Sequence, residues 1–97
     1  MKSMEFVQIE GLPNTKVYEG MNYNVIKFYN TEIVKFTPHF IALNTGGYDR
    51  KVTIKRLNQI SELYELSYHV FNENGLKVRY FNQVIPFVDG MAFDRPQ

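Results

Sequence analysis

The fold is decided by the stretch RKVTIKRLNQISELYELSYHVFNENGLKVRYFN, residues Arg50–Asn82, which holds one amphipathic helix and one β-hairpin. In its first half, apolar side chains recur at helical spacing. They are Leu57, Ile60, Leu63 and Tyr64, extended upstream by Ile54 or Thr53. This spacing predicts a helix over about residues 50–65, and Asp49 is of a residue type that can cap its start.

The second half of this stretch predicts a hairpin. The segments Ser67–Glu73 and Leu76–Asn82 flank Asn74-Gly75. Asn-Gly supplies the two positive-φ positions of a type I′ turn. A two-residue turn at this point predicts the cross-strand pairs Phe71 with Val78, His69 with Tyr80, Tyr68 with Phe81, and Val70 with Arg79.

Short strands are expected on both sides of Arg50–Asn82. Before it, strands are predicted at Phe6–Ile9, Asn24–Asn30, Ile33–Thr37 and Phe40–Leu43, with an irregular stretch marked by Gly11, Pro13, Asn14 and Gly20. After it, Asp89-Gly90 predicts a second hairpin, between Val84–Val88 and Met91–Phe93. Pro86 should lie on an edge, because proline cannot donate to a ladder.

This order predicts an α+β fold, with a single helix packed on a mostly antiparallel sheet and strands before and after the helix. Residues 1–97 are expected to form a single domain, with 1–4 and 94–97 frayed. The chain has 8 Phe and 7 Tyr. These rings predict a β-rich core fringed by tyrosine, or an aromatic binding face or subunit interface.

Composition excludes several classes of protein. The chain has 97 residues, a formal net charge of +1 and no cysteine, so disulfide scaffolds, cysteine-ligated metals and thiol catalysis are excluded. No uncharged apolar run is long enough to span a membrane, and the N-terminus does not read as a secretory signal. We therefore expect a cytoplasmic protein with no membrane partner.

Catalytic groups are sparse. His39 and His69 lie far apart and show no metal-ligand spacing, and Ser3, Ser61 and Ser67 are not in a nucleophile context. There is no phosphate-binding loop motif and no dinucleotide fingerprint. The sequence predicts a protein that is not an enzyme and has no metal or cofactor.

One local conflict marks a candidate site. Four cations, Arg50, Lys51, Lys55 and Arg56, occupy the predicted helix start, where the helix dipole disfavours positive charge. Gly46-Gly47 precedes them and permits unusual backbone conformations. The loop, the helix start and the cations could together bind an anion, a phosphate or an acidic partner. Alternatively, the glycines only reverse the chain and the cations form a solvated face.

Two motifs resemble a family of small phage-encoded domains. The first is Asn44-Thr45-Gly46-Gly47-Tyr48 followed by Thr53, Arg56 and Asn58, and the second is Pro86-Phe87-Val88-Asp89-Gly90-Met91. The family pattern has an Asn-Ser/Thr-Gly-Gly-aromatic loop before a helix and a C-terminal Pro-Phe-x-Asp-Gly-Met element. The resemblance implies a phage or prophage setting and hence the cytoplasm of a bacterial host cell.

Three functions remain open. The first is a small non-enzymatic accessory protein that binds and blocks a host or defence factor. The second is a nucleic-acid or nucleotide binder that uses the Gly-Gly loop and the basic helix start. The third is a structural or assembly component that self-associates through an exposed strand edge. A homodimer is compatible with all three. The candidate ligand- or partner-binding residues are Gly46, Gly47, Tyr48, Arg50, Lys51, Thr53, Lys55, Arg56 and Asn58.

Overall fold

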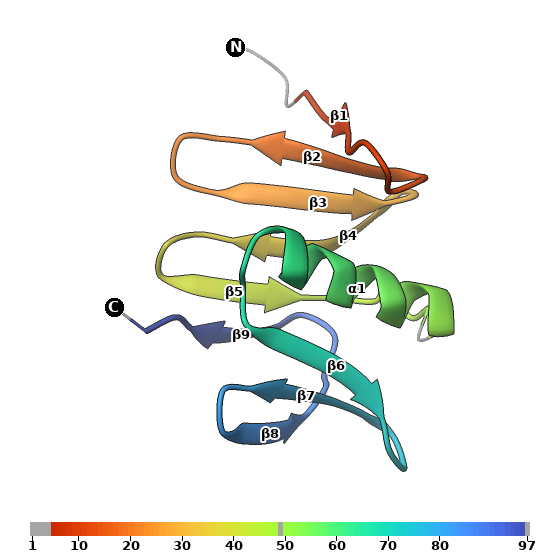
Figure 1. Ribbon diagram of the computed structural model, residues 1–97, viewed down its shortest axis with the longest axis vertical. Coiled ribbons are helices and arrows are strands. Elements are labelled where there is room, and N and C mark those ends of the chain that lie inside the picture. The colour runs from red at the N-terminus through yellow and green to blue at the C-terminus, as the bar shows by residue number, and fades with distance from the viewer. Residues whose placement is uncertain (1–4, 49, 97) are drawn as a thin grey trace.

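The computed structural model describes residues 5–48 and 50–96, and this part of the chain contains nine strands and one helix (Figure 1). Before the helix come β1 (Val7–Gln8), β2 (Thr15–Glu19), β3 (Asn24–Phe28), β4 (Thr31–Phe36) and β5 (Phe40–Leu43). The helix is α1 (Lys51–Leu63). After it come β6 (Tyr68–Asn72), β7 (Leu76–Tyr80), β8 (Gln83–Pro86) and β9 (Met91–Asp94).

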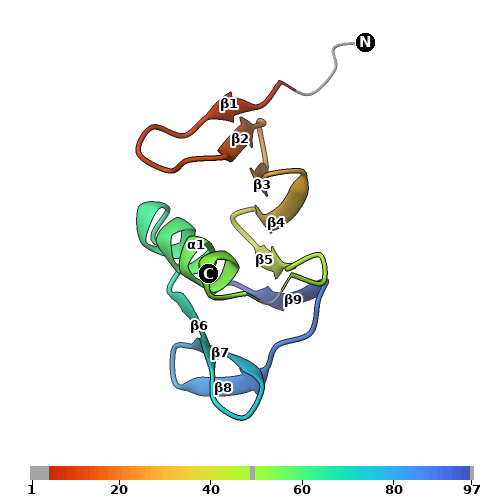
Figure 2. The same ribbon diagram turned by 90° about the vertical axis from the view of Figure 1, so that its right-hand side faces the viewer.

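The strands form two antiparallel sheets. The larger has six strands in the order β1-β2-β3-β4-β5-β9, and the smaller has three in the order β6-β7-β8. Figure 2 shows α1 on one side of the larger sheet, with the other side uncovered. The expected α+β fold, with one helix packed on antiparallel strands that precede and follow it, is confirmed.

The core lies between α1 and the covered face of the larger sheet. Leu57 and Ile60 are fully buried there with sheet side chains that include Ile26, Val34, Phe36, Ile41 and Leu43. The predicted helical stripe is correct for Leu57 and Ile60 but wrong for Leu63, whose side chain is 52% exposed near the end of the helix. Helix residues Thr53, Arg56 and Ser61 are buried as well.

The predicted hairpin exists, but its register is shifted by one residue. Asn74 and Gly75 both have positive φ, as expected, yet Glu73 joins them in a three-residue loop and Asn72 pairs with Leu76. The observed pairs are Tyr68 with Tyr80, His69 with Arg79, Val70 with Val78, and Phe71 with Lys77. The buried face decides this register, because it places the fully buried Val70 opposite Val78 instead of opposite Arg79.

The second predicted hairpin is wrong. The strands that flank Asp89-Gly90 belong to different sheets, since β8 pairs with β7 while β9 pairs with β5. The segment between them is thus a crossover that places β9 at one edge of the larger sheet. Pro86 does lie in an edge strand, as proline requires.

Two further expectations differ from the structure. The stretch predicted to be irregular after residue 10 contains β2, whose Val17 is buried opposite Ile26 of β3. The chain end was expected to fray from residue 94, but Asp94 pairs with Phe40 and the Arg95 amide donates to the His39 carbonyl oxygen. Residues 1–4 and Gln97 lie outside the described residues, as does Asp49, the expected helix cap.

Two side chains of α1 extend the smaller sheet beyond β6. The Asn58 side-chain amide donates to the Val70 carbonyl oxygen at 2.9 Å and accepts from the Val70 amide at 2.7 Å. The Ser61 hydroxyl makes the same pair of bonds with Tyr68, at 2.7 and 3.1 Å. The helix thereby satisfies backbone groups that an edge strand would otherwise leave unpaired.

Candidate functional site

The Gly-Gly loop is held by an aspartate from the other end of the chain. The Asp89 carboxylate accepts hydrogen bonds from the Thr45 amide at 2.7 Å, the Thr45 hydroxyl at 2.8 Å and the Gly47 amide at 3.0 Å. Backbone amides in such a turn can bind an anion. Here the anion is the protein's own carboxylate, so the two motifs that carry the phage resemblance contact each other.

The acidity of Asp89 reflects this position. Partial removal from water raises the pKa, but the hydrogen bonds from the Thr45 amide, the Thr45 hydroxyl and the Gly47 amide outweigh it. The pKa of the Asp89 carboxyl is therefore held below its ordinary value of 3.8. The loop stabilises the charged carboxylate, as hydrogen bonds donated to an anion do.

Gly46 is required at its position for two reasons. Its φ of +66° lies in the left-handed region, which side-chain-bearing residues rarely adopt. A Cβ atom there would also lie 2.7 Å from Cγ2 of Thr31 in β4. Glycine thus lets the loop approach the β3–β4 turn closely.

The four cations of the candidate site do not converge. Arg50 and the exposed Lys51 and Lys55 lie at the start of α1, but of these only Arg50 lines the adjacent hollow described below. Arg56 is 9% exposed and lies with its guanidinium carbon 5.2 Å from the centre of the Phe28 ring. Its Nη1 donates to Gln59, while its buried Nε has no hydrogen-bond partner in the part of the chain that the structure describes.

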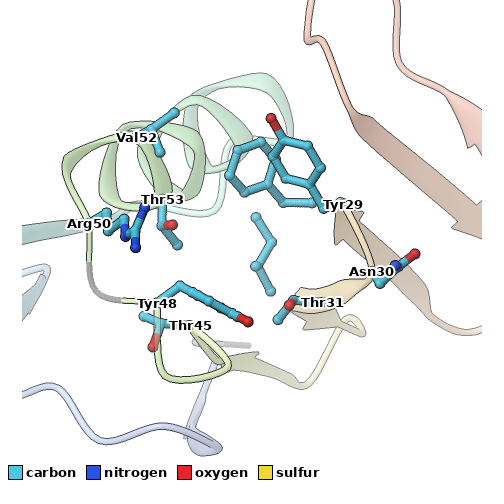
Figure 3. A pocket seen from close by; sticks show the side chains of 10 residues that line it. Tyr29, Asn30, Thr31, Thr45, Tyr48, Arg50, Val52 and Thr53 are labelled. Carbon is cyan, nitrogen blue, oxygen red and sulfur yellow. The ribbon is translucent and has the colours of Figure 1, made fainter.

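Two other predicted site residues have structural contacts. Both the oxygen and the nitrogen of the Asn58 side-chain amide form hydrogen bonds with the backbone of Val70. Thr53 is buried and faces the same hollow as Arg50 (Figure 3). Of the nine predicted residues, the structure brings Tyr48, Arg50 and Thr53 together and places Gly46 and Gly47 in the neighbouring loop.

A hollow of about 440 Å³ opens between the start of α1, the Gly-Gly loop and the β3–β4 turn. Phe28 and Ile33, both buried, are among the residues that line it. Exposed side chains also line it: Tyr29 is 63% exposed, Tyr48 59% and Val52 50%, and Arg50 is exposed beside them. In Figure 3 the Tyr48 side chain extends toward Thr31. Exposed apolar side chains gathered around a concavity are typical of interaction sites.

Tyr29 is fixed at the border of this hollow. Its φ of +56° is unusual for a large residue, and its amide donates to the Asn14 carbonyl oxygen at 2.8 Å. The Asn14 side chain donates to the Tyr29 hydroxyl at 3.1 Å. Tyr29 was not predicted as a site residue, because no sequence pattern links residues 28–31 to the loop at 45–48. The loop lies in the first of the two motifs that carry the phage resemblance, and Asp89 lies in the second. That the two motifs occur together was the signal that could have linked them.

Within residues 5–48 and 50–96, no group of three His, Cys, Asp or Glu side chains is arranged to hold a metal ion. In the same part of the chain, no helix has both the length and the apolar character needed to cross a membrane. The hollow combines aromatic and apolar surface with one guanidinium group, which suits binding.

The chain matches a known family of proteins. A family model described as Kyanoviridae Gp96 protein matches residues 7–94, which include the Thr45–Asp89 contact and every residue that lines the hollow. No curated protein and no solved structure matches the chain.

Proposed function

The chain belongs to the Kyanoviridae Gp96 family of phage proteins, and from that premise we propose that it is a non-enzymatic accessory protein that binds and blocks a host or defence protein. The match confirms the coarser expectation of a small phage-encoded domain. No enzymatic family is indicated by it. The blocking role and the partner are our proposal.

The observation that carries the proposal is the hollow beside Tyr29, Tyr48 and Val52. Tyrosine and arginine are enriched among the residues that dominate protein–protein binding energy. Here two tyrosines and Arg50 surround an apolar floor. The hydrogen bond from Asn14 restrains Tyr29 and so reduces the side-chain entropy that is lost when a partner binds.

Charge favours a partner with an acidic group beside an apolar side chain. Helix α1 begins at the hollow and its first turn contains no acidic residue. Among residues 5–48 and 50–96, no side-chain hydrogen bond caps the start of the helix. Its positive dipole end and Arg50 therefore both favour a carboxylate of the partner.

A nucleotide or nucleic acid bound by the Gly-Gly loop has weaker support. The Gly47 amide already donates to Asp89, and a phosphate would have to displace that carboxylate. Lys51 and Lys55 are exposed but do not line the hollow. Titration of the purified protein with ATP tests this alternative directly.

The proposal is tested with the double variant Tyr48→Ala/Arg50→Ala. Tagged protein is expressed in the bacterial host, co-purifying proteins are identified, and the complex is rebuilt from purified components. We expect the wild type to bind one host protein stoichiometrically and lower its activity, and the double variant to bind at least about tenfold more weakly, as loss of a hot spot predicts.

The matched control is Phe81→Ala/Val84→Ala. Both side chains are about half exposed but do not line the hollow, since they lie in and just before β8 of the smaller sheet. We expect this control to bind like the wild type. Equal binding by Tyr48→Ala/Arg50→Ala and the wild type would show that the hollow is not the binding site, and a bound partner whose activity is unchanged would refute the blocking role.

A further inference from the structure

The face of the larger sheet that α1 leaves uncovered carries aromatic rings and lysines together. Side chains alternate between the two faces of a strand, and the buried residues of β2 to β4 mark the covered face. Opposite that face, six residues form what we call the aromatic–lysine face: Phe6, Lys16, Tyr18, Tyr23, Lys27 and Lys35. Figure 2 shows no element over this side of β2, β3 and β4.

The rings of this face form a continuous row. The ring centres of Phe6 and Tyr18 are 6.0 Å apart, and those of Tyr18 and Tyr23 are 5.6 Å apart. All three side chains are partly exposed, and Val25, directly opposite Tyr18 in β3, is buried. The row of rings therefore packs against the sheet, while part of each aromatic side chain remains exposed to solvent.

The lysines are placed among the rings. Lys27 Nζ lies 4.4 Å from the centre of the Phe6 ring, and Lys35 Nζ lies 5.2 Å from the centre of the Tyr23 ring. Lys16 is directly opposite Lys27 in the β2–β3 ladder. Like charges in directly opposed positions destabilise a sheet. A local conflict of this kind is expected where function requires it.

Negative charge on this face is limited. Glu32 is opposite Lys27 across the β3–β4 ladder, and Asp94 lies in β9, three strands away from β3. Glu19 is aligned with Asn24 on the covered side and acts electrostatically on Tyr64. Within residues 5–48 and 50–96, none of the three lysines forms an ion pair. Their ammonium groups are thus available to a polyanion.

We propose that the aromatic–lysine face binds single-stranded nucleic acid. Aromatic side chains on a sheet offer stacking surfaces to unpaired bases, and every base can stack whatever its sequence. The lysines lie on neighbouring strands, a few ångströms apart. Their positive charges can therefore contact the phosphates that join those bases. A duplex keeps its bases stacked inside the double helix, so it could contact this face only through its phosphates and the lysines.

The experiment is fluorescence anisotropy with a labelled oligothymidine of about 15 nucleotides, long enough to fill one such site. An oligouridine and a duplex of equal length are measured in parallel. Contacts from three lysines to phosphates predict a slope of log K against log salt of about −2. The single strands should bind more tightly than the duplex, and the two single-stranded probes distinguish DNA from RNA.

Two matched pairs of substitutions locate the site. Lys16→Gln/Lys27→Gln should reduce the slope to about −0.7, because one phosphate contact remains. Lys51→Gln/Lys55→Gln removes the same charge from the exposed side of α1 and should leave the slope unchanged. Tyr18→Leu, which keeps Val25 covered, should weaken binding by about tenfold through lost stacking. Circular dichroism checks that each variant is folded.

Three results would overturn the proposal. The first is no binding of either single strand at low salt, which would leave the face to a protein partner. The second is an equal loss of binding in the two lysine variants, or a loss confined to Lys51→Gln/Lys55→Gln, since either would place the nucleic acid elsewhere. The third is tighter binding of the duplex with no effect of Tyr18→Leu, because stacking would then play no part.

Discussion

The amide nitrogen of Gly47 donates a hydrogen bond to Oδ2 of Asp89 at 3.0 Å across 42 residues of sequence. This contact joins the loop before α1 to the crossover between β8 and β9. The amides of this turn, which could bind an external anion, thus bind a carboxylate of the same chain. The contact holds the loop in place beside the hollow.

Asp89→Asn should lower the free energy of unfolding by about 1–3 kcal/mol. The reason is that an asparagine amide turns one acceptor into a donor, which would face the Thr45 or Gly47 amide. Chemical denaturation measures the change. The matched control is Asp94→Asn, an exposed carboxylate in β9 with the same charge, which should change stability little. Equal effects in both variants would show that the Thr45–Gly47 contact contributes nothing.

The Asp89 contact should also make stability depend on pH. Its folded-state pKa lies below the ordinary value of 3.8, so its contribution is fully present above that value and is lost as the pH falls through the folded-state pKa. The difference in unfolding free energy between wild type and Asp89→Asn should therefore be constant near neutral pH and shrink in acid. A difference that grows on acidification would contradict the lowered pKa.

Gly46→Ala should destabilise the protein by about 1–3 kcal/mol, through a strained positive φ and the close approach of Thr31. The double variant Gly46→Ala/Thr31→Ser should recover part of the loss, because the Cγ2 atom at 2.7 Å is removed. Gly47→Ala, which also has positive φ but open space around it, isolates the backbone effect. Thermal unfolding of the three variants checks this, and no recovery in the double variant would show that Thr31 moves freely.

Asn58→Asp should lower the free energy of unfolding by about 1–3 kcal/mol, because its carboxylate cannot donate to the Val70 carbonyl oxygen. Hydrogen exchange at the Val70 amide, which donates to Asn58, is the residue-specific measurement. The control is Glu62→Gln on the exposed side of α1. Unchanged stability in Asn58→Asp would show that the helix does not protect the edge of β6.

The sequence by itself determined the local elements whose signals lie within a few residues. The repeat of Leu57 and Ile60 predicted α1, and Asn74-Gly75 predicted a reversal with two positive φ values, because helical periodicity and turn chemistry act over short distances. The α+β class followed from the order of these elements.

Only the tertiary structure decided which segments meet. The hairpin register depended on which face of β6 is buried, and the role of Asp89 depended on a crossover between two sheets. The hollow and the aromatic–lysine face each combine residues from separate strands and loops. Such neighbours are set by how much apolar surface each packing arrangement buries, a sum over the whole chain that no short segment of sequence contains.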